Sequence, residues 1–390
     1  MSALERALTV EDLRKLAQRR VPKQFYDYID SGAYSEGTYN SNEADFKKIT
    51  FRQRVAVNLE NRNLGSTLLG QPVSLPVAIA PVGSTGMTAP DGEIKAALAA
   101  EKFGIPFTLS TMAICSIEDV AENTTKPFWF QLYVMKDRKF IERLIDRAKA
   151  AKCSALVLTM DLQILGQRHK DVRNGLTAPP KLTPKFFAEI ALKPAWAFGM
   201  LGTNRRTFRN IAGHVSDAVN LASLSEWTKT QFDLTLNWKD IAWIKDRFGG
   251  PVIVKGILDA EDAQLAIDNG ADAIVVSNHG GRQLDGAPSS IRVLPSIVDA
   301  VGHKTEVLMD GGIRSGQDLL KALALGAKGA MIGRIMAYGL GAGGEAGVLR
   351  ALEIVRREAD TTMALMGERD IRNIGLHNIY SNELDRRQGY

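Results

Sequence analysis

Short apolar runs alternate with stretches of helical period along most of the chain. The runs are rich in Val, Ile, Leu and Phe without polar alternation, which is typical of strands buried on both faces of a parallel sheet. They lie at residues 77–80, 107–110, 128–134, 155–160, 252–256, 273–277, 306–309 and 330–333. Helical periodicity is clearest at residues 92–103, 138–151, 260–269 and 316–325. This order predicts an α/β protein with a closed (β/α)₈ TIM barrel, and a doubly wound open sheet is the alternative.

Two regions fall outside this repeating pattern. Residues 1–75 hold helical stretches at 10–18 and 22–31 and then an irregular segment. We expect them to form an N-terminal helical arm packed on a barrel of residues 76–390. The second region, 170–238, follows the fourth strand and is far longer than a usual βα connection, which predicts a functional or disordered insertion.

Composition narrows the class of protein. With 390 residues and 45% hydrophobic content, the chain can bury a large core, and its net charge of +5 does not by itself indicate a nucleic-acid partner. Only Cys115 and Cys153 are present, so a disulfide framework or a structural zinc site is not expected, and a reducing compartment fits. The N-terminus lacks the apolar core of a signal peptide, and no apolar run is long enough to predict a spanning helix.

Polar and ionisable residues gather at the carboxyl ends of the predicted strands, where barrels of this class build their active sites. In chain order, the candidate site residues at or near these strand ends, glycines and apolar neighbours included, are Pro81, Val82, Gly83, Ser110, Met112, Gln131, Tyr133, Thr159, Asp161, Arg168, Lys255, Ser277, His279, Arg282, Asp310, Gly311, Gly312, Arg314, Gly333 and Arg334. A purely structural barrel does not need this concentration, so we predict a catalytic site at this end.

The last two strand ends carry a candidate phosphate site. Gly311 and Gly312 follow the seventh strand, and Gly333 follows the eighth. Glycines let backbone N–H groups approach a phosphate, and the nearby Arg314 and Arg334 can add charge-assisted hydrogen bonds. The alternative is that these glycines only permit tight turns.

His279 is the candidate general base, because histidine titrates near neutral pH. Arg282 can bind a substrate carboxylate through two parallel bonds, and Asp161 can orient the imidazole. Lys255 can stabilise negative charge on a reduced cofactor. A structural histidine and structural ion pairs remain the alternative for each of these residues.

Several long segments resemble the FMN-dependent L-2-hydroxy acid dehydrogenase and oxidase family. The segment SNHGGRQLDG at 277–286 is similar to the family's active-site signature, and PKQFYDYIDSGA near 22, LVLTMD at 156, VIVKGI at 252 and LMDGGIRSGQD at 308 extend the match. The resemblance covers about residues 10–363. Segments such as APVGSTGM at 80 and FTLSTMAICSIEDVA at 107 most resemble the bacterial respiratory L-lactate dehydrogenases.

The resemblance implies a role for each site residue. His279 would be the base supported by Asp161, with Tyr133 on the substrate hydroxyl. The substrate carboxylate would lie among Arg282, Arg168 and Tyr28. The cofactor FMN would contact residues of three groups: around the ring system Pro81, Val82, Gly83, Ser110, Gln131, Thr159, Lys255 and Ser277, along the ribityl chain Asp310, and at the phosphate Gly311, Gly312, Arg314, Gly333 and Arg334.

The resemblance also implies an activity. We expect oxidation of an L-2-hydroxy acid, above all L-lactate to pyruvate, with electrons passed to a quinone or cytochrome. Alternatives are an oxidase that uses O₂, another FMN- or phosphate-binding barrel enzyme, and a non-catalytic binding barrel. Met112 stands where glycolate oxidase has tryptophan, and it is expected either to widen the substrate pocket or to fill a gap in the core. Leu162 to Leu165 also depart from the family pattern, which affects fine specificity.

The insertion carries a further clue. Residues 170–215 contain eight Lys or Arg against two Asp or Glu, interleaved with Phe186, Phe187, Trp196, Phe198, Met200 and Leu201. Such a segment can lie on an anionic membrane, and in the respiratory relatives the equivalent region is tied to membrane attachment. A mobile lid with solvated charges is the alternative. We therefore expect a cytoplasmic, peripheral protein on the inner face of the membrane. The resemblance to the family also implies a homotetramer. No nucleic-acid partner is expected.

Overall fold

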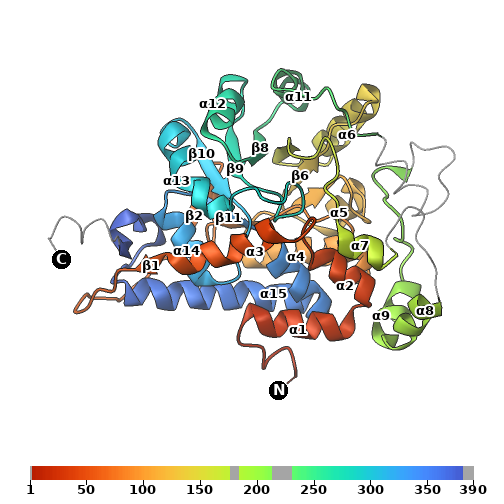
Figure 1. The fold of residues 1–390 in the computed structure, drawn as a ribbon, viewed down its shortest axis with the longest axis horizontal. Helices are drawn as coiled ribbons and strands as arrows, with labels where there is room; N and C mark the ends of the chain where they lie inside the picture. The colour runs from red at the N-terminus through yellow and green to blue at the C-terminus, as the bar shows by residue number, and fades with distance from the viewer. Residues whose placement is uncertain (1, 176–183, 213–230, 381–390) are drawn as a thin grey trace.

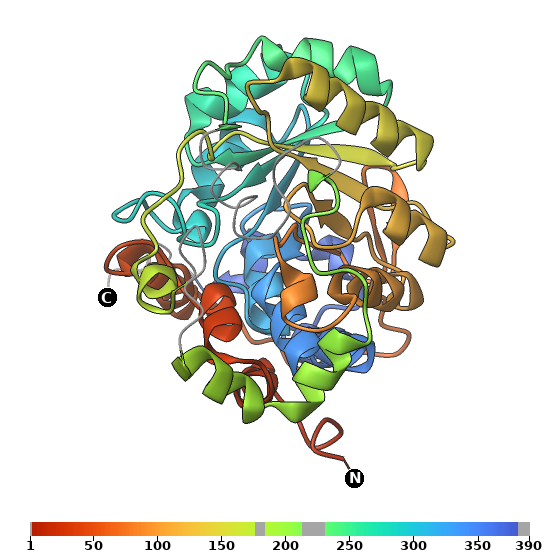
Figure 2. The ribbon, with the colours of Figure 1, turned by 90° about the vertical axis from the view of Figure 1, so that its right-hand side faces the viewer.

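The computed structural model describes residues 2–175, 184–212 and 231–380, and eight parallel strands form the centre of this part of the chain (Figures 1 and 2). The strands are β4 (Val77–Ile79), β5 (Thr108–Ser110), β6 (Trp129–Leu132), β7 (Ala155–Thr159), β8 (Val252–Ile257), β9 (Ala273–Val276), β10 (Glu306–Met309) and β11 (Gly329–Ile332). Neighbours along the chain are neighbours in the sheet, and β11 pairs with β4. A parallel bridge between Ile79 and Phe107 closes the ring. The predicted TIM barrel is confirmed.

The strands form where the sequence is apolar on both faces. Every residue of β7, from Ala155 to Thr159, is buried, and the same holds for β6 and β9. One face of each strand packs inside the barrel and the other packs under the surrounding helices, which removes the polar alternation of a half-exposed strand. Each predicted apolar run therefore corresponds to one strand.

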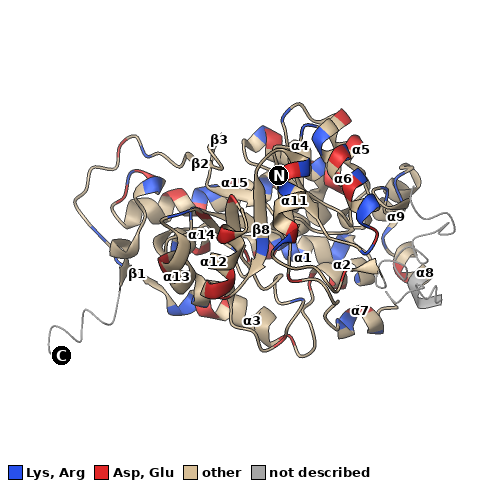
Figure 3. Ribbon diagram, turned by 90° about the horizontal axis from the view of Figure 1, so that it is seen from above, with Lys and Arg blue, Asp and Glu red and all other residues tan. Residues whose placement is uncertain are grey.

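Helices cover the outside of the barrel (Figure 2). They are α4 (Gly92–Phe103), α5 (Ile117–Asn123), α6 (Arg138–Ala150), α11 (Asp240–Phe248), α12 (Ala260–Asp268), α13 (Ser290–Val301), α14 (Gly316–Ala324) and α15 (Arg334–Leu365). Side-chain caps begin several of them, including Ser116 before α5, Asp137 before α6 and Ser315 before α14. Basic and acidic side chains are interspersed along α6, whereas the charged side chains of α5 are all acidic (Figure 3).

The N-terminal segment lies against the barrel. It contains α1 (Val10–Arg20), α2 (Lys23–Ile29), α3 (Gly37–Ala44) and the short helix Asp45–Lys48. Helix α1 runs beside α15 (Figure 1). Both predicted helical stretches of this segment are helices.

Two small antiparallel sheets complete the described fold. Strand β1 (Thr50–Phe51) pairs with β12 (Ile379–Tyr380) near the C-terminus, and β2 (Ser66–Leu68) pairs with β3 (Gln71–Val73). Gly329 at the start of β11 lies directly against Leu68, which places the β2–β3 hairpin at the amino-terminal end of the barrel.

In the described part of the segment after β7 lie the helices α7 (His169–Arg173), α8 (Pro184–Ala191) and α9 (Pro194–Leu201). Parts of the predicted insertion, 176–183 and 213–230, lie outside the described residues. Between them, Phe208 and Ile211 are buried, and the Asn210 side chain accepts a hydrogen bond from the Ile117 amide at 2.9 Å. This stretch is thus part of the barrel's packing. Among the described residues, no helix combines the length and the apolar character needed to cross a membrane.

Candidate active site

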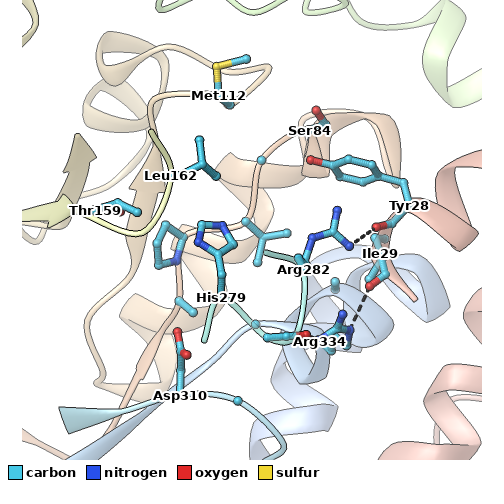
Figure 4. Close-up of a pocket in the computed structure, with 18 of the residues that line it drawn as sticks. Tyr28, Ile29, Ser84, Met112, Thr159, Leu162, His279, Arg282, Asp310 and Arg334 are labelled. Carbon is cyan, nitrogen blue, oxygen red and sulfur yellow. Dashed lines mark hydrogen bonds between the residues drawn. The ribbon is translucent and has the colours of Figure 1, made fainter. Parts of the chain in front are cut away.

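A cavity of about 310 Å³ opens at the carboxyl ends of the strands, where the sequence predicts the site (Figure 4). Most predicted positions line it: Tyr28, Pro81, Val82, Gly83, Met112, Tyr133, Thr159, Arg168, Lys255, His279, Arg282, Asp310, Gly311, Gly312, Arg314, Gly333 and Arg334. Ser110, Gln131, Asp161 and Ser277 do not line it, but each is hydrogen-bonded to other members of the predicted set. The structure thus brings the whole predicted set together.

His279 follows β9 in a left-handed conformation, with φ of 57°. Its amide donates to Ser277 Oγ at 3.0 Å, and its Nδ1 lies 2.8 Å from Asp161 Oδ1 at the end of β7. Because an ionised carboxylate can only accept, Nδ1 carries a proton and Nε2 is the free base. The Tyr133 hydroxyl lies 3.4 Å from Nε2, so both groups can meet one substrate.

The electrostatics of this pair suit proton abstraction. Burial lowers the pKa of His279 below its usual value, and the neighbouring Asp161 charge offsets only part of that effect. Burial alone would raise the pKa of Asp161, but the charge of His279 and its hydrogen bond lower it overall. At neutral pH the pair is therefore a neutral imidazole beside an ionised carboxylate, as a general base requires.

Gln283 ties together the two loops that carry this pair. Its Nε2 donates to Asp161 O at 2.7 Å and to Ile164 O at 2.8 Å, and its Oε1 accepts from the Gly166 amide at 3.0 Å. The sequence analysis did not single out Gln283, although it lies inside the signature segment.

Arg282 and Arg168 form a cationic corner of the cavity. The Arg282 guanidinium lies over the Tyr28 ring at 4.8 Å, and both burial and the charge of Arg168 lower its pKa. Arg282 Nη2 and Arg168 Nε are buried without a hydrogen-bond partner among the described residues. Two guanidinium groups that each keep an unpartnered nitrogen are suited to bind a carboxylate.

Asp171 lies at the same corner, and the sequence analysis missed it. It lines the cavity from α7, and burial raises the pKa of its carboxyl although Arg282 and Arg168 act in the opposite direction. No local pattern marks it, because only the docking of α7 on the arm buries it. Lys170 of the same helix pairs with Glu36 of the arm at 2.9 Å.

A buried ion pair between β8 and the end of β10 lines the cavity. Lys255 Nζ is 3.0 Å from Asp310 Oδ2 and donates to Ser277 Oγ at 2.9 Å. Burial would lower the pKa of Lys255, but Asp310 and Asp161 raise it overall, so the ammonium group stays charged. Asp310 Oδ1 has no hydrogen-bond partner among the described residues and can accept from a bound group.

A chain of uncharged groups continues along the neighbouring strands. Ser110 Oγ donates to Gln131 Oε1 at 2.9 Å, and Gln131 Nε2 donates to Thr159 Oγ1 at 3.0 Å. The chain fixes the orientation of the Gln131 amide behind Thr159, which lines the cavity. Thr159 therefore presents a polar, uncharged group to the cavity, with the other two residues behind it.

The turn after β10 meets the N-terminal arm. Gly312 has φ of +88°, and a Cβ added there would lie 2.0 Å from the Asn42 carbonyl oxygen. The close approach of the arm therefore requires this glycine, whatever the turn binds. Arg314 pairs with Glu43 at 2.9 Å, and Arg334 hydrogen-bonds to backbone carbonyls of the arm.

The remaining wall of the cavity is apolar. Met112 lines it and also packs against the core, and the Tyr133 ring packs edge-on against Phe232 at 5.7 Å. Phe208 and Leu162 add to this wall. The sequence analysis missed Phe208 and Phe232, because they come from the irregular segment after β7 and carry no periodic signal.

The donor set fits FMN. One end of the cavity offers Arg314, Arg334 and a glycine turn for a phosphate, and the middle offers the unpartnered oxygen of Asp310 for hydroxyl groups. The buried ammonium of Lys255 can stabilise negative charge on a flavin ring. The guanidinium groups of the opposite corner remain available for a second, smaller anion.

Comparisons with known proteins agree with this geometry. The model of a family described as FMN-dependent dehydrogenase matches residues 17–381. The chain is 47% identical over 365 residues to an L-lactate dehydrogenase of Caulobacter vibrioides, covering 93% of this chain and 95% of that protein. It is 45% identical over 368 residues to an L-lactate dehydrogenase of Pseudomonas syringae, with coverage of 94% and 96%.

A solved structure extends the likeness to three dimensions. A monotopic membrane protein, (S)-mandelate dehydrogenase, superposes with a TM-score of 0.92 at 36% identity, covering 96% of this chain and 99% of that one. The family match spans the arm from residue 17 on, the barrel and every residue of the cavity described above. The chain belongs to the FMN-dependent dehydrogenase family.

Proposed function

We propose that this FMN-dependent oxidoreductase converts L-lactate to pyruvate. The observation that carries the proposal is the free Nε2 of His279 facing the same cavity as the unpartnered guanidinium atoms of Arg282 and Arg168. A base and a carboxylate subsite side by side are what a 2-hydroxy acid needs. The two relatives named L-lactate dehydrogenase support the choice of substrate.

The side chains divide the work as follows. Arg282 and Arg168 bind the carboxylate, and the Tyr133 hydroxyl hydrogen-bonds the substrate oxygen. His279 Nε2 accepts the proton that leaves the substrate, and the Asp161 carboxylate stabilises the resulting imidazolium. Bound FMN supplies the two-electron acceptor.

We propose that the FMN ring system contacts Pro81–Gly83, Ser110, Gln131, Thr159, Ser277 and Lys255. The ribityl chain would contact Asp310, and the phosphate would contact Gly311, Gly312, Arg314, Gly333 and Arg334.

The visible spectrum of the purified protein under anaerobic addition of L-lactate tests this proposal. We expect a yellow protein that bleaches within seconds. A yellow protein that does not bleach with lactate but does with mandelate, glycolate or a longer acid would replace the substrate and keep the reaction. A colourless protein that cannot be reconstituted with FMN would refute the proposal.

We further propose that the electrons pass to a quinone or cytochrome at a membrane. Helix α9 carries the support: Phe198 and Leu201 are 73% and 69% exposed, while Trp196 of the same helix is anchored on Phe25 at a ring distance of 5.4 Å. The likeness to a monotopic membrane protein points the same way. An anchored helix with exposed large apolar side chains suits the interface of a lipid bilayer.

The basic residues that follow α9 support membrane contact less than the sequence pattern indicates, because they form ion pairs within the protein. Arg205 pairs with Asp91 and Asp119 of the barrel, at 3.1 and 3.0 Å, and Arg209 pairs with Asp119 at 3.1 Å. These arginines fasten the segment to the barrel. The apolar side chains of α9 are therefore the main candidates for lipid contact.

The oxidase alternative is tested by peroxide. A lactate oxidase of Pediococcus acidilactici has the same fold, with a TM-score of 0.82 at 32% identity. Peroxide formed in step with lactate oxidation in air would favour that alternative over a quinone or cytochrome acceptor.

We also propose a homotetramer on the cytoplasmic face of the membrane, which sedimentation and membrane-sidedness assays can test.

A further inference from the structure

One short piece of backbone holds two arginines of the cavity. It comprises residues 28–31, the last residues of α2 and the two that follow, and is called the α2 end below. The carbonyl of Ser31 accepts a hydrogen bond from Arg282 Nη1 at 2.9 Å and another from Arg334 Nη2 at 2.7 Å. The positions of the two guanidinium groups therefore depend on one peptide unit.

Each arginine makes a second, separate contact with the α2 end (Figure 4). Arg282 Nη1 donates to Tyr28 O at 2.7 Å, and Arg334 Nε donates to Ile29 O at 3.0 Å. Each guanidinium also lies over a tyrosine ring of the arm, Arg282 over Tyr28 at 4.8 Å and Arg334 over Tyr39 at 4.6 Å. Backbone and ring together fix the plane of each group.

These contacts hold the two cations without neutralising them. Among the described residues, neither Arg282 nor Arg334 forms an ion pair with a carboxylate. The carbonyls at the end of a helix carry partial negative charge and lack intrahelical partners, so they can accept from guanidinium groups. Full positive charge remains available for an anion on each arginine.

Asp30 anchors the α2 end from the other side. Its side chain does not line the cavity, and only 8% of the residue is exposed. Burial would raise the pKa of Asp30, but hydrogen bonds from tyrosine hydroxyls and from Arg14 lower it to about 2. The donors are Tyr338 Oη at 2.6 Å, Arg14 Nη2 at 2.8 Å, Tyr26 Oη at 3.0 Å and Tyr39 Oη at 3.1 Å.

The donors tie Asp30 to Arg334 by a second route. Tyr338 lies one helical turn after Arg334 in α15, and Tyr39 is the residue whose ring lies on the Arg334 guanidinium. One buried carboxylate therefore connects the arm, the first turn of α15 and the carbonyls that hold both arginines.

We propose that Asp30 is a positioning residue for both anion subsites, the one for the substrate carboxylate at Arg282 and the one for the FMN phosphate at Arg334. The inference rests on the proposed function, which supplies the two ligands. Charge-assisted hydrogen bonds depend on the position of the guanidinium, so a small shift of the α2 end weakens both. The general base His279 and its carboxylate partner Asp161 have no contact with Asp30 and stay in place.

The substitution Asp30→Asn tests this role through binding as well as activity. Oxalate serves as a carboxylate probe that cannot be oxidised. We expect the dissociation constants of FMN from the apoprotein and of oxalate from the FMN-loaded protein each to rise about tenfold or more, as expected for losing one charge-assisted hydrogen bond. At saturating FMN and lactate, the rate constant for flavin reduction should change much less than either dissociation constant.

Two further variants separate positioning from general destabilisation. Tyr338→Phe removes a single donor to Asp30 and should weaken both ligands in the same direction, but less. Leu13→Ala opens the apolar core of α1, where Leu13 is fully buried, and should lower the melting temperature without changing either dissociation constant.

The outcomes distinguish a failure of the role proposed for Asp30 from a failure of the proposed function. If the wild-type protein binds FMN and oxalate and both Asp30→Asn and Tyr338→Phe bind them equally well, the role of Asp30 is refuted. Weakening by Leu13→Ala in proportion to its loss of melting temperature would refute it too. A wild-type protein that binds neither ligand would refute the proposed function itself.

Discussion

His279 Nδ1 lies 2.8 Å from Asp161 Oδ1, although the two residues are 118 positions apart in the chain. They come from the ends of β9 and β7, which are both neighbours of β8 in the barrel. Their contact fixes the tautomer of His279 and leaves Nε2 free toward the cavity. The reaction that we propose depends on this relationship more than on any other in the molecule.

Replacing His279 with glutamine should remove the base and keep the cofactor. Glutamine preserves much of the shape and can still hydrogen-bond, but it cannot take a proton. We expect FMN reduction by L-lactate to slow by about 10²–10⁴-fold or more, the usual contribution of a general base. Anaerobic stopped-flow absorbance measures this rate. Reduction at the wild-type rate in a variant with full FMN content would exclude His279 as the base.

The pH dependence of flavin reduction should report the pKa of His279. The base works only when neutral, so activity rises with pH through that pKa. Because burial lowers the pKa of His279, the acidic limb of kcat/KM should lie below the usual histidine value. Asp161→Asn removes the charge that raises this pKa, so its limb should move to still lower pH while the maximum rate falls. A limb shifted upward in Asp161→Asn would contradict this account.

Lys255→Met should destabilise the protein and weaken FMN binding. The substitution leaves Asp310 as a buried carboxylate without its cation, which costs about 3–5 kcal/mol of unfolding free energy in comparable pairs. Urea unfolding of the apoprotein measures the loss. Arg372→Met is the matched control, because its pair with Asp370 is on the surface and should contribute little. Equal effects of the two substitutions would show that burial of the pair is unimportant.

Gly312→Ala and Gly286→Ala separate backbone strain from steric contact. Both glycines have nearly the same positive φ, +88° and +90°, but only Gly312 lies against the arm, at Asn42. Gly286→Ala should cost about 1–2 kcal/mol from strain alone. Gly312→Ala should cost about 1–3 kcal/mol more, because the arm must move. Urea unfolding compares them, and similar losses would argue against tight docking of the arm here.

The apolar face of α9 should be required for membrane contact. We expect wild-type protein to sediment with vesicles that contain anionic lipid, and the double substitution Phe198→Ser with Leu201→Ser to reduce binding at least about tenfold, since each large apolar side chain contributes about 1.5–3 kcal/mol when buried. Leu365→Ser with Leu376→Ser is the control, because these leucines are also exposed but lie in the C-terminal part. Vesicle binding that both double variants keep would locate the contact elsewhere.

The strand order and most of the cavity could be predicted because they depend on local signals. Buried parallel strands need continuous apolar runs, and each run marks a strand end where functional groups must lie. His279, Arg282 and Asp310 could therefore be assigned to one site before their contacts were known. Helices such as α4 were predictable in the same way, from their period.

The residues that were missed depend on contacts between distant segments. Asp171 is part of the site only because α7 docks on the arm, and Phe232 only because an irregular segment folds back against Tyr133. No period or motif in the neighbouring sequence encodes such contacts.

The sequence by itself determined the barrel, its strand ends and the chemical groups that the strands carry, because burial on both faces and a Gly-rich turn leave direct traces in residue order. Only the tertiary structure decided how those groups are held. The shared carbonyl of Ser31, the buried carboxylate of Asp30 and the close approach of Asn42 to Gly312 all join the arm to the far end of the chain. Such contacts arise from packing in three dimensions, which the order of residues along one strand or helix does not express.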